Sequence, residues 1–291
     1  MLDCLVIGAG PAGLTAAMYL ARYRRSIRVI DGGHSRAQLI PTSHNYPGYK
    51  GVGGTELLEK LREQAMRYGV SLEKGNVEAL RIDPPHGFRA LAGKIDLPTR
   101  TVLLATGLVD KKPRFAVMSE DPHPAVRYCP ICDGFEAMDR TIAVLGGEEA
   151  AKKALFLRTF SKDVRWFMDS DSTGTPSEAA LSHGIPCHGQ AIQLQATAKG
   201  IRVKTADGEL YHADLLYPAL GCEVRSGLAT ALGARCAPVG TLIVDEHQQT
   251  SVDGLYAIGD VVSDLHQIAV ATGHAAVAAT AIHNRLPRNP R

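Results

Sequence analysis

The chain has few aromatic residues and almost no excess of charge. Aromatic residues make up 5% of its 291 residues, and 32 basic side chains against 30 acidic ones leave a formal charge of +2. Nucleic-acid binding usually requires a strongly basic face, and base stacking requires aromatic side chains. The composition therefore predicts no nucleic-acid partner.

The sequence also lacks the segments that direct a chain to or across a membrane. No basic cluster and apolar run of the signal-peptide type opens the chain. The longest apolar stretch, 268–282, is too short to span a bilayer and contains Gly273 and His274. Six cysteines are too few for a secreted disulfide scaffold of this length. These absences predict a cytoplasmic protein in a reducing compartment, with no membrane partner.

Apolar residues make up 45% of the chain, which is enough for a sizeable core in about two domains. A strand, glycine turn, helix and strand follow one another at the start of the sequence. The apolar run 2–7 leads into the turn 8–13, a helix pattern continues to Tyr23, and strand 27–30 ends at Asp31. This order of elements is typical of a mononucleotide-binding βαβ unit.

The same pattern occurs again in the middle of the chain. Strand 141–145 leads into Gly146-Gly147, a helix pattern covers 149–160, and strand 164–168 is followed by Asp169. In both copies the aspartate follows the first glycine by the same interval. We therefore expect an α/β protein with two Rossmann-like domains.

The segments between and after these units carry weaker patterns. The stretch 108–124 contains prolines and two adjacent lysines, which favours an interdomain linker. The other expected elements are a helix at 55–68, strands at 100–105, 215–220 and 255–258, a hairpin at 202–212 turning at Asp207-Gly208, and a final helix at 267–284.

The first glycine turn has the spacing G-x-G-x-x-G in the context that a dinucleotide requires. Gly8 permits the tight turn, Gly10 lets the backbone approach a pyrophosphate, and Gly13 lets the helix pack on the strand. Asp31 stands where a carboxylate accepts hydrogen bonds from a ribose diol. The alternative, a glycine-rich turn of an unrelated α/β protein, would need strand, helix and acid to coincide by chance.

The second glycine turn is altered. Glu148 and Glu149 follow Gly146-Gly147 where a further glycine is expected. A carboxylate next to a pyrophosphate is repulsive. We therefore expect this unit to keep its fold and to have lost the nucleotide.

Two of the cysteines form the motif Cys129-Pro130-Ile131-Cys132, followed at once by Asp133. Thiol–disulfide exchange needs a thiolate, a resolving thiol and a group that moves protons. The alternative is half of a zinc site, but no second CxxC or HxxxH occurs, and Cys187-His188 and His123 are the only nearby candidates. We predict no metal site, and we expect the remaining cysteines to be core or inert residues.

Together these motifs resemble those of the low-molecular-weight thioredoxin reductases, and the resemblance covers nearly the whole chain. In chain order the shared motifs are Gly8–Gly13, Asn45-Tyr46-Pro47-Gly48, Ala105-Thr106-Gly107, Cys129–Gly134 and Gly254-Leu255-Tyr256-Ala257-Ile258-Gly259-Asp260. The resemblance implies a discontinuous FAD-binding domain at 1–112 and 241–291. It also implies an inserted nicotinamide-domain-like unit at 113–240, which carries the redox pair.

The resemblance also assigns the site residues. It implies that FAD is bound by Gly8, Gly10, Pro11, Ala12, Gly13, Asp31, Gly32, Gln38, Leu39, Asn45, Val77, Ala105, Thr106, Gly107, Gly259, Asp260, His266, Gln267 and Ile268. Cys129 and Cys132 would be the disulfide that faces the flavin, and Asp133 the proton donor.

Three features depart from the family pattern. NADPH-using members carry a His-Arg-Arg cluster where this chain has Met168-Asp169-Ser170-Asp171, so a nicotinamide nucleotide is doubtful and NADPH is disfavoured. Pro130 between the cysteines resembles the pyridine-nucleotide-independent dithiol oxidases. Those oxidases also tend to have a histidine near His274, which could take a thiol proton.

The sequence therefore predicts an FAD-dependent thiol–disulfide oxidoreductase and leaves the direction of electron flow open. One hypothesis is a thioredoxin-reductase-like enzyme that acts on a thioredoxin-like protein with a donor other than NADPH. Another is an oxygen-dependent oxidase that closes a disulfide in a small-molecule dithiol. A third, of another class, is a flavin-bound redox sensor. The resemblance further implies a homodimer.

Overall fold

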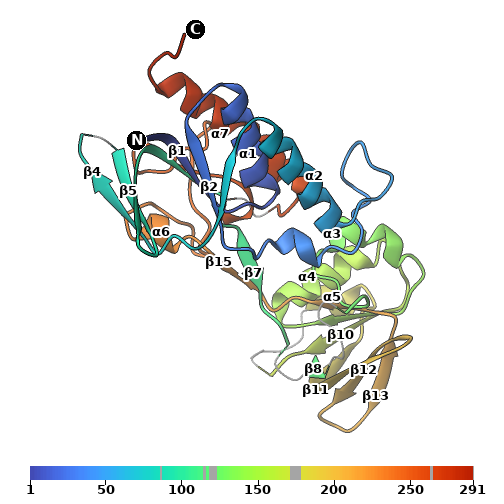
Figure 1. Cartoon of the computed structure of the whole chain (residues 1–291). Coiled ribbons are helices and arrows are strands. Elements are labelled where there is room, and N and C mark those ends of the chain that lie inside the picture. Colours follow the sequence, from blue (N-terminus) through green and yellow to red (C-terminus); the bar gives the residue numbers. More distant parts are fainter. Residues whose placement is uncertain (86, 114–115, 118–122, 171–177, 263–264, 291) are drawn as a thin grey trace. The chain divides into compact units, whose positions relative to one another are not determined.

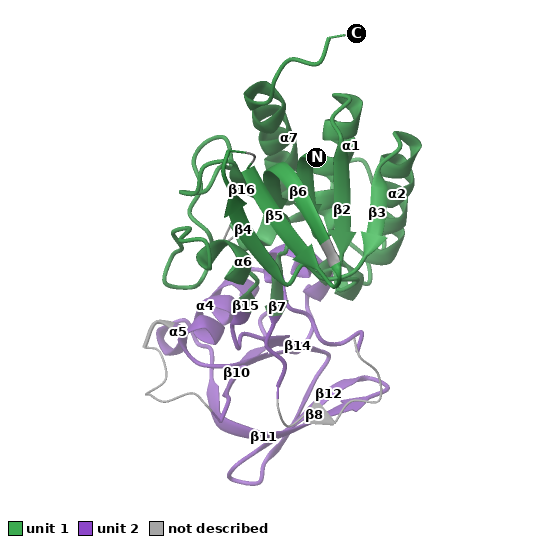
Figure 2. Cartoon of the chain, turned by 60° about the vertical axis from the view of Figure 1, so that its left-hand side comes forward, with its two compact units in different colours: residues 1–109, 223–291 green, residues 110–222 purple. Residues whose placement is uncertain are grey.

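The computed structural model describes residues 1–85, 87–113, 116–117, 123–170, 178–262 and 265–290. They form two compact units, of which the first comprises Met1–Val109 and Glu223–Arg291 and the second Asp110–Cys222 (Figure 2). The segment 223–240 belongs to the first unit, whereas the sequence assigned it to the insertion. The physical reason is burial, because Ala229 and Ala234 pack in the same apolar core as Leu5 of the first strand.

A seven-stranded sheet forms the centre of the first unit (Figure 1). Five of its strands pair in parallel, and an antiparallel hairpin extends one edge. In pairing order the strands are β3 (Ser71–Lys74), β2 (Ile27–Asp31), β1 (Leu2–Ile7), β6 (Ile95–Leu104), β5 (Gly87–Ala92) and β4 (Ala79–Asp83), with β16 (Leu255–Ala257) beside β6.

Three long helices cover one face of this sheet, namely α1 (Pro11–Arg22), α2 (Gly54–Arg67) and α7 (Ile268–Arg285). Successive side chains of a strand point to opposite faces. Cys4 and Val6 of β1 accordingly lie in the core under these helices, while Leu5 and Ile7 lie in the core on the other face. A strand buried on both faces has to be apolar throughout, as the run 2–7 is.

Short elements complete the first unit and the connections. They are η1 (Arg36–Leu39), β7 (Leu108–Asp110), β15 (Cys222–Val224), α6 (Gly227–Thr230) and η3 (Gly259–Val261). β7 and β15, where the chain passes between the units, pair with each other.

The second unit contains another seven-stranded sheet. In pairing order its strands are β13 (Leu210–Ala213), β12 (Gly200–Thr205), β11 (Cys187–Thr197), β10 (Val164–Met168), β9 (Ile142–Leu145) and β14 (Leu215–Pro218), with β8 (Ala116–Val117) beside β11. Its helices are α3 (Pro130–Asp133), η2 (Phe135–Ala137), α4 (Glu148–Leu157) and α5 (Glu178–Ser182).

Both predicted βαβ units are confirmed, as β1–α1–β2 and β9–α4–β10 with parallel strand pairs. The predicted hairpin is also present, because β12 and β13 pair in antiparallel fashion on either side of Gly208. The expected linker 108–124 contains β7 and β8, and its residues 114–115 and 118–122 lie outside the described part of the chain.

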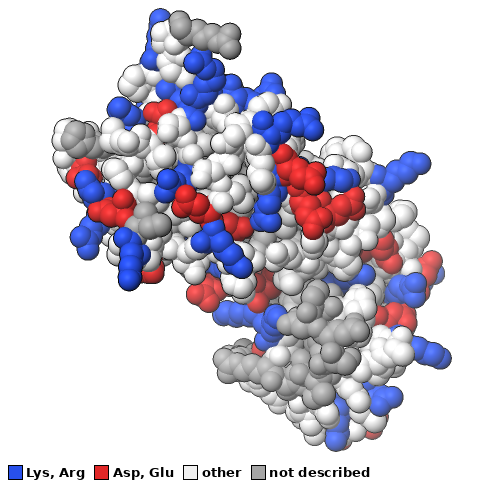
Figure 3. Space-filling view, viewed as in Figure 1, with Lys and Arg blue, Asp and Glu red and all other residues white. Residues whose placement is uncertain are grey.

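Charged side chains of both signs are intermixed on the face of the molecule drawn in Figure 3. None of the helices in the described ranges is both long enough and apolar enough to cross a membrane.

Arg25 ties the end of α7 to the loop that follows α1. Arg25 is buried, with an exposed fraction of only 7%. Its Nε–H donates to His283 Nδ1 at 3.0 Å, and its two terminal nitrogens donate to the carbonyl oxygens of His283 and Pro287, both at 2.8 Å. The last carbonyls of a helix have no partner within the helix, and this guanidinium supplies a donor to that of His283 and to the carbonyl of Pro287 after the helix.

Replacing Arg25 with Met should therefore lower the free energy of unfolding by about 2 kcal/mol, because the charge-assisted hydrogen bonds of its buried guanidinium are lost. Arg81→Met is the matched control, since Arg81 is exposed on β4. Thermal unfolding of the flavin-loaded protein measures both. Equal melting temperatures for the two variants would contradict the role assigned to Arg25.

Candidate functional site

The turn between β1 and α1 is built on backbone contacts that exclude side chains. Gly8 has a φ of +104°, and a Cβ there would overlap the carbonyl oxygen of Ala105. A Cβ at Gly13 would in turn overlap the carbonyl oxygen of Gly8. Helix α1 therefore starts directly above the end of β1, with Gly10 as its N-cap and Pro11 as its first residue. Its first N–H groups and its dipole suit an anion.

The segment after β6 closes against this turn. The N–H of Ala105 donates to the carbonyl of Ile7 at 2.8 Å, which extends the sheet by one step. The Thr106 hydroxyl donates to the carbonyl oxygen of Arg225 at 2.7 Å, and Gly107 has a φ of +64°. Ala12, the remaining predicted residue of the turn, lies in α1 with its Cβ 3.1 Å from where a Cβ of Gly259 would be.

Asp31 ends β2 with its carboxylate held on both oxygens. Oδ1 accepts the N–H of Gly33 at 2.9 Å, and Oδ2 accepts Nη2 of Arg62 from α2 at 3.0 Å. The segment that contains Val77 lies beside this end of β2, because the N–H of Gly75 donates to the carbonyl of Asp31 at 2.9 Å. A Cβ at Gly32 would come within 2.6 Å of Asn76 Oδ1.

Residues far apart in the sequence meet at the start of α7. Asn45 Nδ2 donates to Gln267 Oε1 at 2.8 Å, although 222 positions separate them. Gln267 is the N-cap of α7, flanked by His266 and Ile268. Asp260 in η3 forms an ion pair with Arg36, whose Nη1 lies 3.4 Å from its Oδ2. Gln38 and Leu39 follow Arg36 in η1.

Two basic residues of this unit, Arg36 and Arg62, were not predicted from the sequence. Arg36 and Arg62 contact the two predicted carboxylates, Asp260 and Asp31, from other elements of the same unit. The pairs span more than 200 and about 30 positions, and no local pattern of residues marks them.

In the second unit the two cysteines of the CxxC motif form a disulfide. Cys129 and Cys132 have a Cα–Cα distance of 5.3 Å, and both residues are half-buried. Pro130 begins α3, where a missing N–H costs nothing. Gly134 ends the motif, and a Cβ there would lie 2.6 Å from the ring of Phe160, so the turn packs closely on its own unit.

Asp133 lies in a polar cluster that is largely shielded from solvent. Its side chain is 17% exposed; the Tyr217 hydroxyl donates to Oδ1 at 2.8 Å, and Arg127 Nε lies 3.7 Å from Oδ2. Burial raises the pKa of Asp133, while the hydrogen bond from Tyr217 and the charge of Arg127 oppose that rise. Tyr217 and Arg127 are further residues that sequence reasoning missed.

The altered glycine turn begins α4 in the register that the sequence predicts. Gly146 has a φ of +137°, Gly147 is the N-cap, and Glu148 and Glu149 occupy the first turn of the helix. The indole N–H of Trp166 donates to the carbonyl oxygen of Gly146 at 2.7 Å. Asp169 follows β10 directly, whereas Asp171 lies outside the described residues.

His274 lies on α7 in the first unit, half-buried, and burial lowers the pKa of its imidazole. Its Nδ1 is buried and has no hydrogen-bond partner among the residues that the structure describes. The redox pair belongs to the second unit, so the proton-transfer role of His274 stays a prediction.

The other four cysteines are not disulfide-bonded. Burial raises the pKa of Cys4 to about 12, which makes its thiol unreactive at neutral pH. Cys187 and Cys222 are half-buried and Cys236 is exposed. Within the described ranges, no three His, Cys, Asp or Glu side chains gather closely enough to hold a metal ion.

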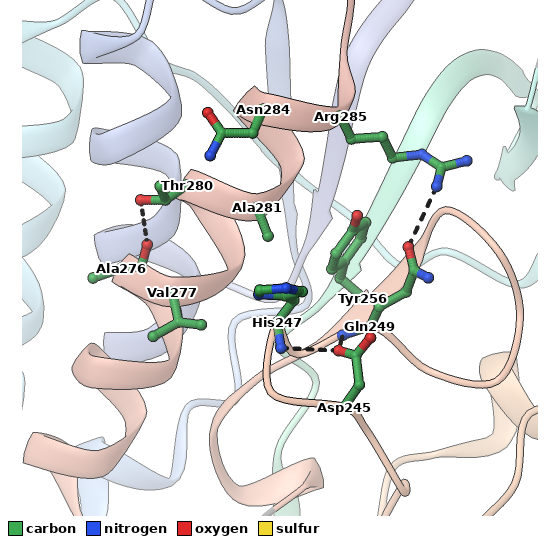
Figure 4. A pocket seen from close by; sticks show the side chains of 10 residues that line it. All are labelled: Asp245, His247, Gln249, Tyr256, Ala276, Val277, Thr280, Ala281, Asn284 and Arg285. Atoms are coloured by element: carbon green, nitrogen blue, oxygen red, sulfur yellow. Dashed lines mark hydrogen bonds between the residues drawn. The ribbon is translucent and has the colours of Figure 1, made fainter.

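A separate pocket of about 730 Å³ lies in the first unit between α7 and the loop 245–249 (Figure 4). Asp245 shapes that loop, because its Oδ1 accepts the N–H groups of His247 and Gln249 at 2.9 and 2.8 Å. Residues of α7 from Ala276 to Arg285 and the ring of Tyr256 form the rest of the wall. None of the predicted site residues lines this pocket.

Residues 2–276 match the family model of the pyridine nucleotide-disulphide oxidoreductases. The chain belongs to this family. It is 30% identical to the thioredoxin reductase of Mycoplasmopsis pulmonis, with 98% of each chain covered. Two solved structures are also similar. They are the thioredoxin reductase of Streptococcus pyogenes (26% identity, TM-score 0.86, 98% and 97% covered) and HlmI (29% identity, TM-score 0.89, 97% and 92% covered). The protein is thus a thioredoxin reductase-like flavoenzyme, an FAD-dependent disulfide oxidoreductase.

Two glycine-to-alanine variants test the first glycine turn. Gly13→Ala should abolish FAD retention, since the new Cβ overlaps the Gly8 carbonyl oxygen and forces α1 away from β1. Gly273→Ala is the control, because a Cβ at Gly273 in α7 has open space around it and alanine favours helix by about 1 kcal/mol. The flavin-to-protein absorbance ratio of the purified variants measures retention. A Gly13→Ala protein as yellow as the control would contradict this role of the turn.

Proposed function

We propose that electrons pass between FAD and the Cys129/Cys132 pair, and between that pair and a dithiol or disulfide substrate. The observation that carries this proposal is the Cys129–Cys132 disulfide beside the shielded carboxyl group of Asp133. Disulfide exchange requires a pair of sulfurs that can open and close and a nearby group that moves protons. Both requirements are met within one unit.

The residues of the first unit fit FAD. The turn 8–13 starts α1 at the end of β1, where a helix N-terminus suits a pyrophosphate. Asp31 offers a carboxylate for a ribose, and Asn45, Asp260 and Gln267 would lie along the flavin and its ribityl chain. The other predicted FAD residues lie in the same turn, after β2, in η1, between β3 and β4, after β6, in η3, or at the start of α7. When bound, FAD supplies the two-electron redox chemistry.

In this proposal, NADPH does not reduce the flavin as it does in ordinary thioredoxin reductases. Glu148 and Glu149 stand in the first turn of α4, where a nucleotide phosphate would have to lie. Asp169 stands after β10, where the resemblance leads one to expect basic residues for a 2′-phosphate. Glu148 and Glu149 would repel the phosphates that NADH and NADPH share, and Asp169 would also repel the 2′-phosphate that only NADPH carries. NADPH is therefore disfavoured more strongly than NADH.

The same carboxylates favour a second candidate function, an oxygen-dependent dithiol oxidase. A dithiol substrate would give its electrons to the disulfide and then to the flavin, and oxygen would take them from the flavin, so no nicotinamide would be needed. Proline at position 130, at the start of α3, agrees with the resemblance to that branch. A flavin-bound redox sensor is the remaining alternative, and fast turnover with any dithiol or disulfide would exclude it.

Similarity to the family supports our proposals for the substrate class and the assembly. Its thioredoxin reductase relatives support a thioredoxin-like protein as substrate, and the oxidase alternative supports a small-molecule dithiol. We infer a homodimer in the cytoplasm, with no nucleic-acid partner, in line with the near-neutral charge of the chain.

Cys132→Ser tests the redox centre. Because the resolving thiol is missing, the Cys129 thiolate should attack the disulfide of an oxidised substrate and stay joined to one of its sulfurs, while the other sulfur leaves as a thiol. Mass spectrometry detects this mixed disulfide after non-reducing isolation. Cys236→Ser is the control, since Cys236 is an exposed free thiol, and it should form no such adduct at Cys129. Full dithiol-driven flavin reduction in the Cys132→Ser variant would disprove the assignment.

The single tryptophan reports on the second glycine turn. Trp166 donates to Gly146, so a reduced nicotinamide nucleotide bound there should quench its fluorescence. We expect no saturable quenching by NADPH in the native protein and measurable binding of NADH in Glu148→Gly, which removes one of the acidic side chains. Saturable quenching of the native protein by micromolar NADPH would contradict this interpretation of Glu148.

A further inference from the structure

Tyr217 is a buried titratable residue that the family resemblance leaves without a role. It lies in β14, between Leu216 and Pro218, and its side chain is fully buried in the core of the second unit. Its hydroxyl nevertheless has two acceptors, Oδ1 of Asp133 at 2.8 Å and the backbone carbonyl of Asp133 at 3.4 Å. An aliphatic or phenylalanine side chain would fill the same strand position without this bond.

The backbone brings these two residues together through a parallel bridge. The N–H of Arg127 donates to the carbonyl of Leu216, and the N–H of Leu216 donates to the carbonyl of Ala125, both at 2.8 Å. The segment that leads into Cys129 is therefore hydrogen-bonded to β14 at Leu216, the residue directly before Tyr217.

Lys153 of α4 also forms hydrogen bonds to both the segment before Cys129 and β14. From α4, its ammonium group donates to the carbonyl of Tyr128 at 3.1 Å and to that of Pro218 at 3.2 Å. Tyr128 directly precedes Cys129, and Pro218 directly follows Tyr217. The disulfide segment and β14 are thus held in a fixed relation on both sides of the Tyr217–Asp133 bond.

We propose that Tyr217 is a positioning residue that holds the Asp133 carboxyl group, through its buried hydroxyl, for proton exchange with the redox cysteines. This proposal rests on the proposed function, in which Asp133 moves the proton. When a substrate thiolate attacks one sulfur of the disulfide, a new S–S bond forms and the Cys129–Cys132 bond breaks. The leaving cysteine keeps the electron pair of that bond and takes the proton of neutral Asp133. In the reverse exchange the carboxylate takes the proton back.

The charged and titratable groups around Asp133 determine in which direction its pKa shifts when the Tyr217 hydroxyl is removed. Arg127 faces Oδ2, Glu136 from η2 adds negative charge, and Tyr217 donates to Oδ1. Loss of the hydroxyl leaves the carboxylate desolvated and without a donor on Oδ1, so the pKa of Asp133 rises further. A hydrogen bond to a charged group corresponds to about one pH unit.

The experiment follows the rate of anaerobic flavin reduction by dithiothreitol against pH in five proteins. These are the native protein, Tyr217→Phe, Asp133→Asn, the double variant Tyr217→Phe/Asp133→Asn, and Tyr211→Phe. Dividing each profile by that of Asp133→Asn removes the titration of the reductant's own thiols. Tyr211→Phe is the matched control, because Tyr211 lies on β13 of the same unit and packs on Phe167 and His188.

We expect the Asp133 inflection to move upward by about one pH unit in Tyr217→Phe and to stay in place in Tyr211→Phe. We also expect Tyr217→Phe to have no effect on the profile in the Asp133→Asn background, which a purely structural role of the tyrosine would not produce. Should Tyr217→Phe fail to fold, Arg127→Gln tests the same carboxyl group from its half-exposed side, with a shift in the same direction.

An unchanged inflection in Tyr217→Phe, with the inflection absent in Asp133→Asn, would overturn the proposal and leave the proposed function intact. So would an effect of Tyr217→Phe that persists in the Asp133→Asn background. If Asp133→Asn itself keeps the native profile, Asp133 does not move the proton, and the role of Tyr217 falls with it. Loss of the redox centre as a whole is recognised separately, by full flavin reduction in Cys132→Ser.

Discussion

The contact between the Gly8 carbonyl oxygen and the backbone of Gly13 is the constraint on which the first unit depends. Helix α1 can start at the end of β1 only because neither residue has a side chain at this point. Ala105 closes the same point from β6, so the ends of two parallel strands and the start of one helix meet there. A ligand with phosphate groups suits this place, since unpaired N–H groups point outward from it.

The second unit has the same strand–turn–helix construction with different side chains at its turn. Gly146 again packs against a neighbouring strand end, here the Ala219 carbonyl oxygen. Its own carbonyl is bonded to Trp166, and carboxylates occupy the first helical turn. The fold of a mononucleotide-binding unit is retained, because Gly146 allows the helix to pack on the strand. In the proposed function, the two glutamates repel a nucleotide phosphate and the chemistry of this unit lies at the disulfide and Asp133.

Most of the fold could be predicted from local patterns in the sequence. Both βαβ units, the hairpin at Gly208 and the last helix follow from turn residues and periodicity, which depend on neighbours in the sequence. The end of the insertion was misplaced, because Ala229 and Ala234 are short residues whose burial beside Leu5 leaves no periodic pattern. Tyr217, Arg36 and Arg62 were missed for a related reason. Each acts on a carboxylate that only the tertiary fold brings near, and Tyr217 stands within an otherwise apolar strand.

The central claim is that this flavin exchanges electrons with a cysteine pair that a dithiol reduces, and that NADPH is not its direct donor. An anaerobic titration of the purified yellow protein, followed at the flavin absorbance band, tests it most directly. The account predicts that a dithiol bleaches the flavin, that the colour returns when air is admitted, and that NADPH at equal concentration leaves the band unchanged. Stoichiometric bleaching by NADPH would contradict the account and assign the protein to the ordinary thioredoxin reductases.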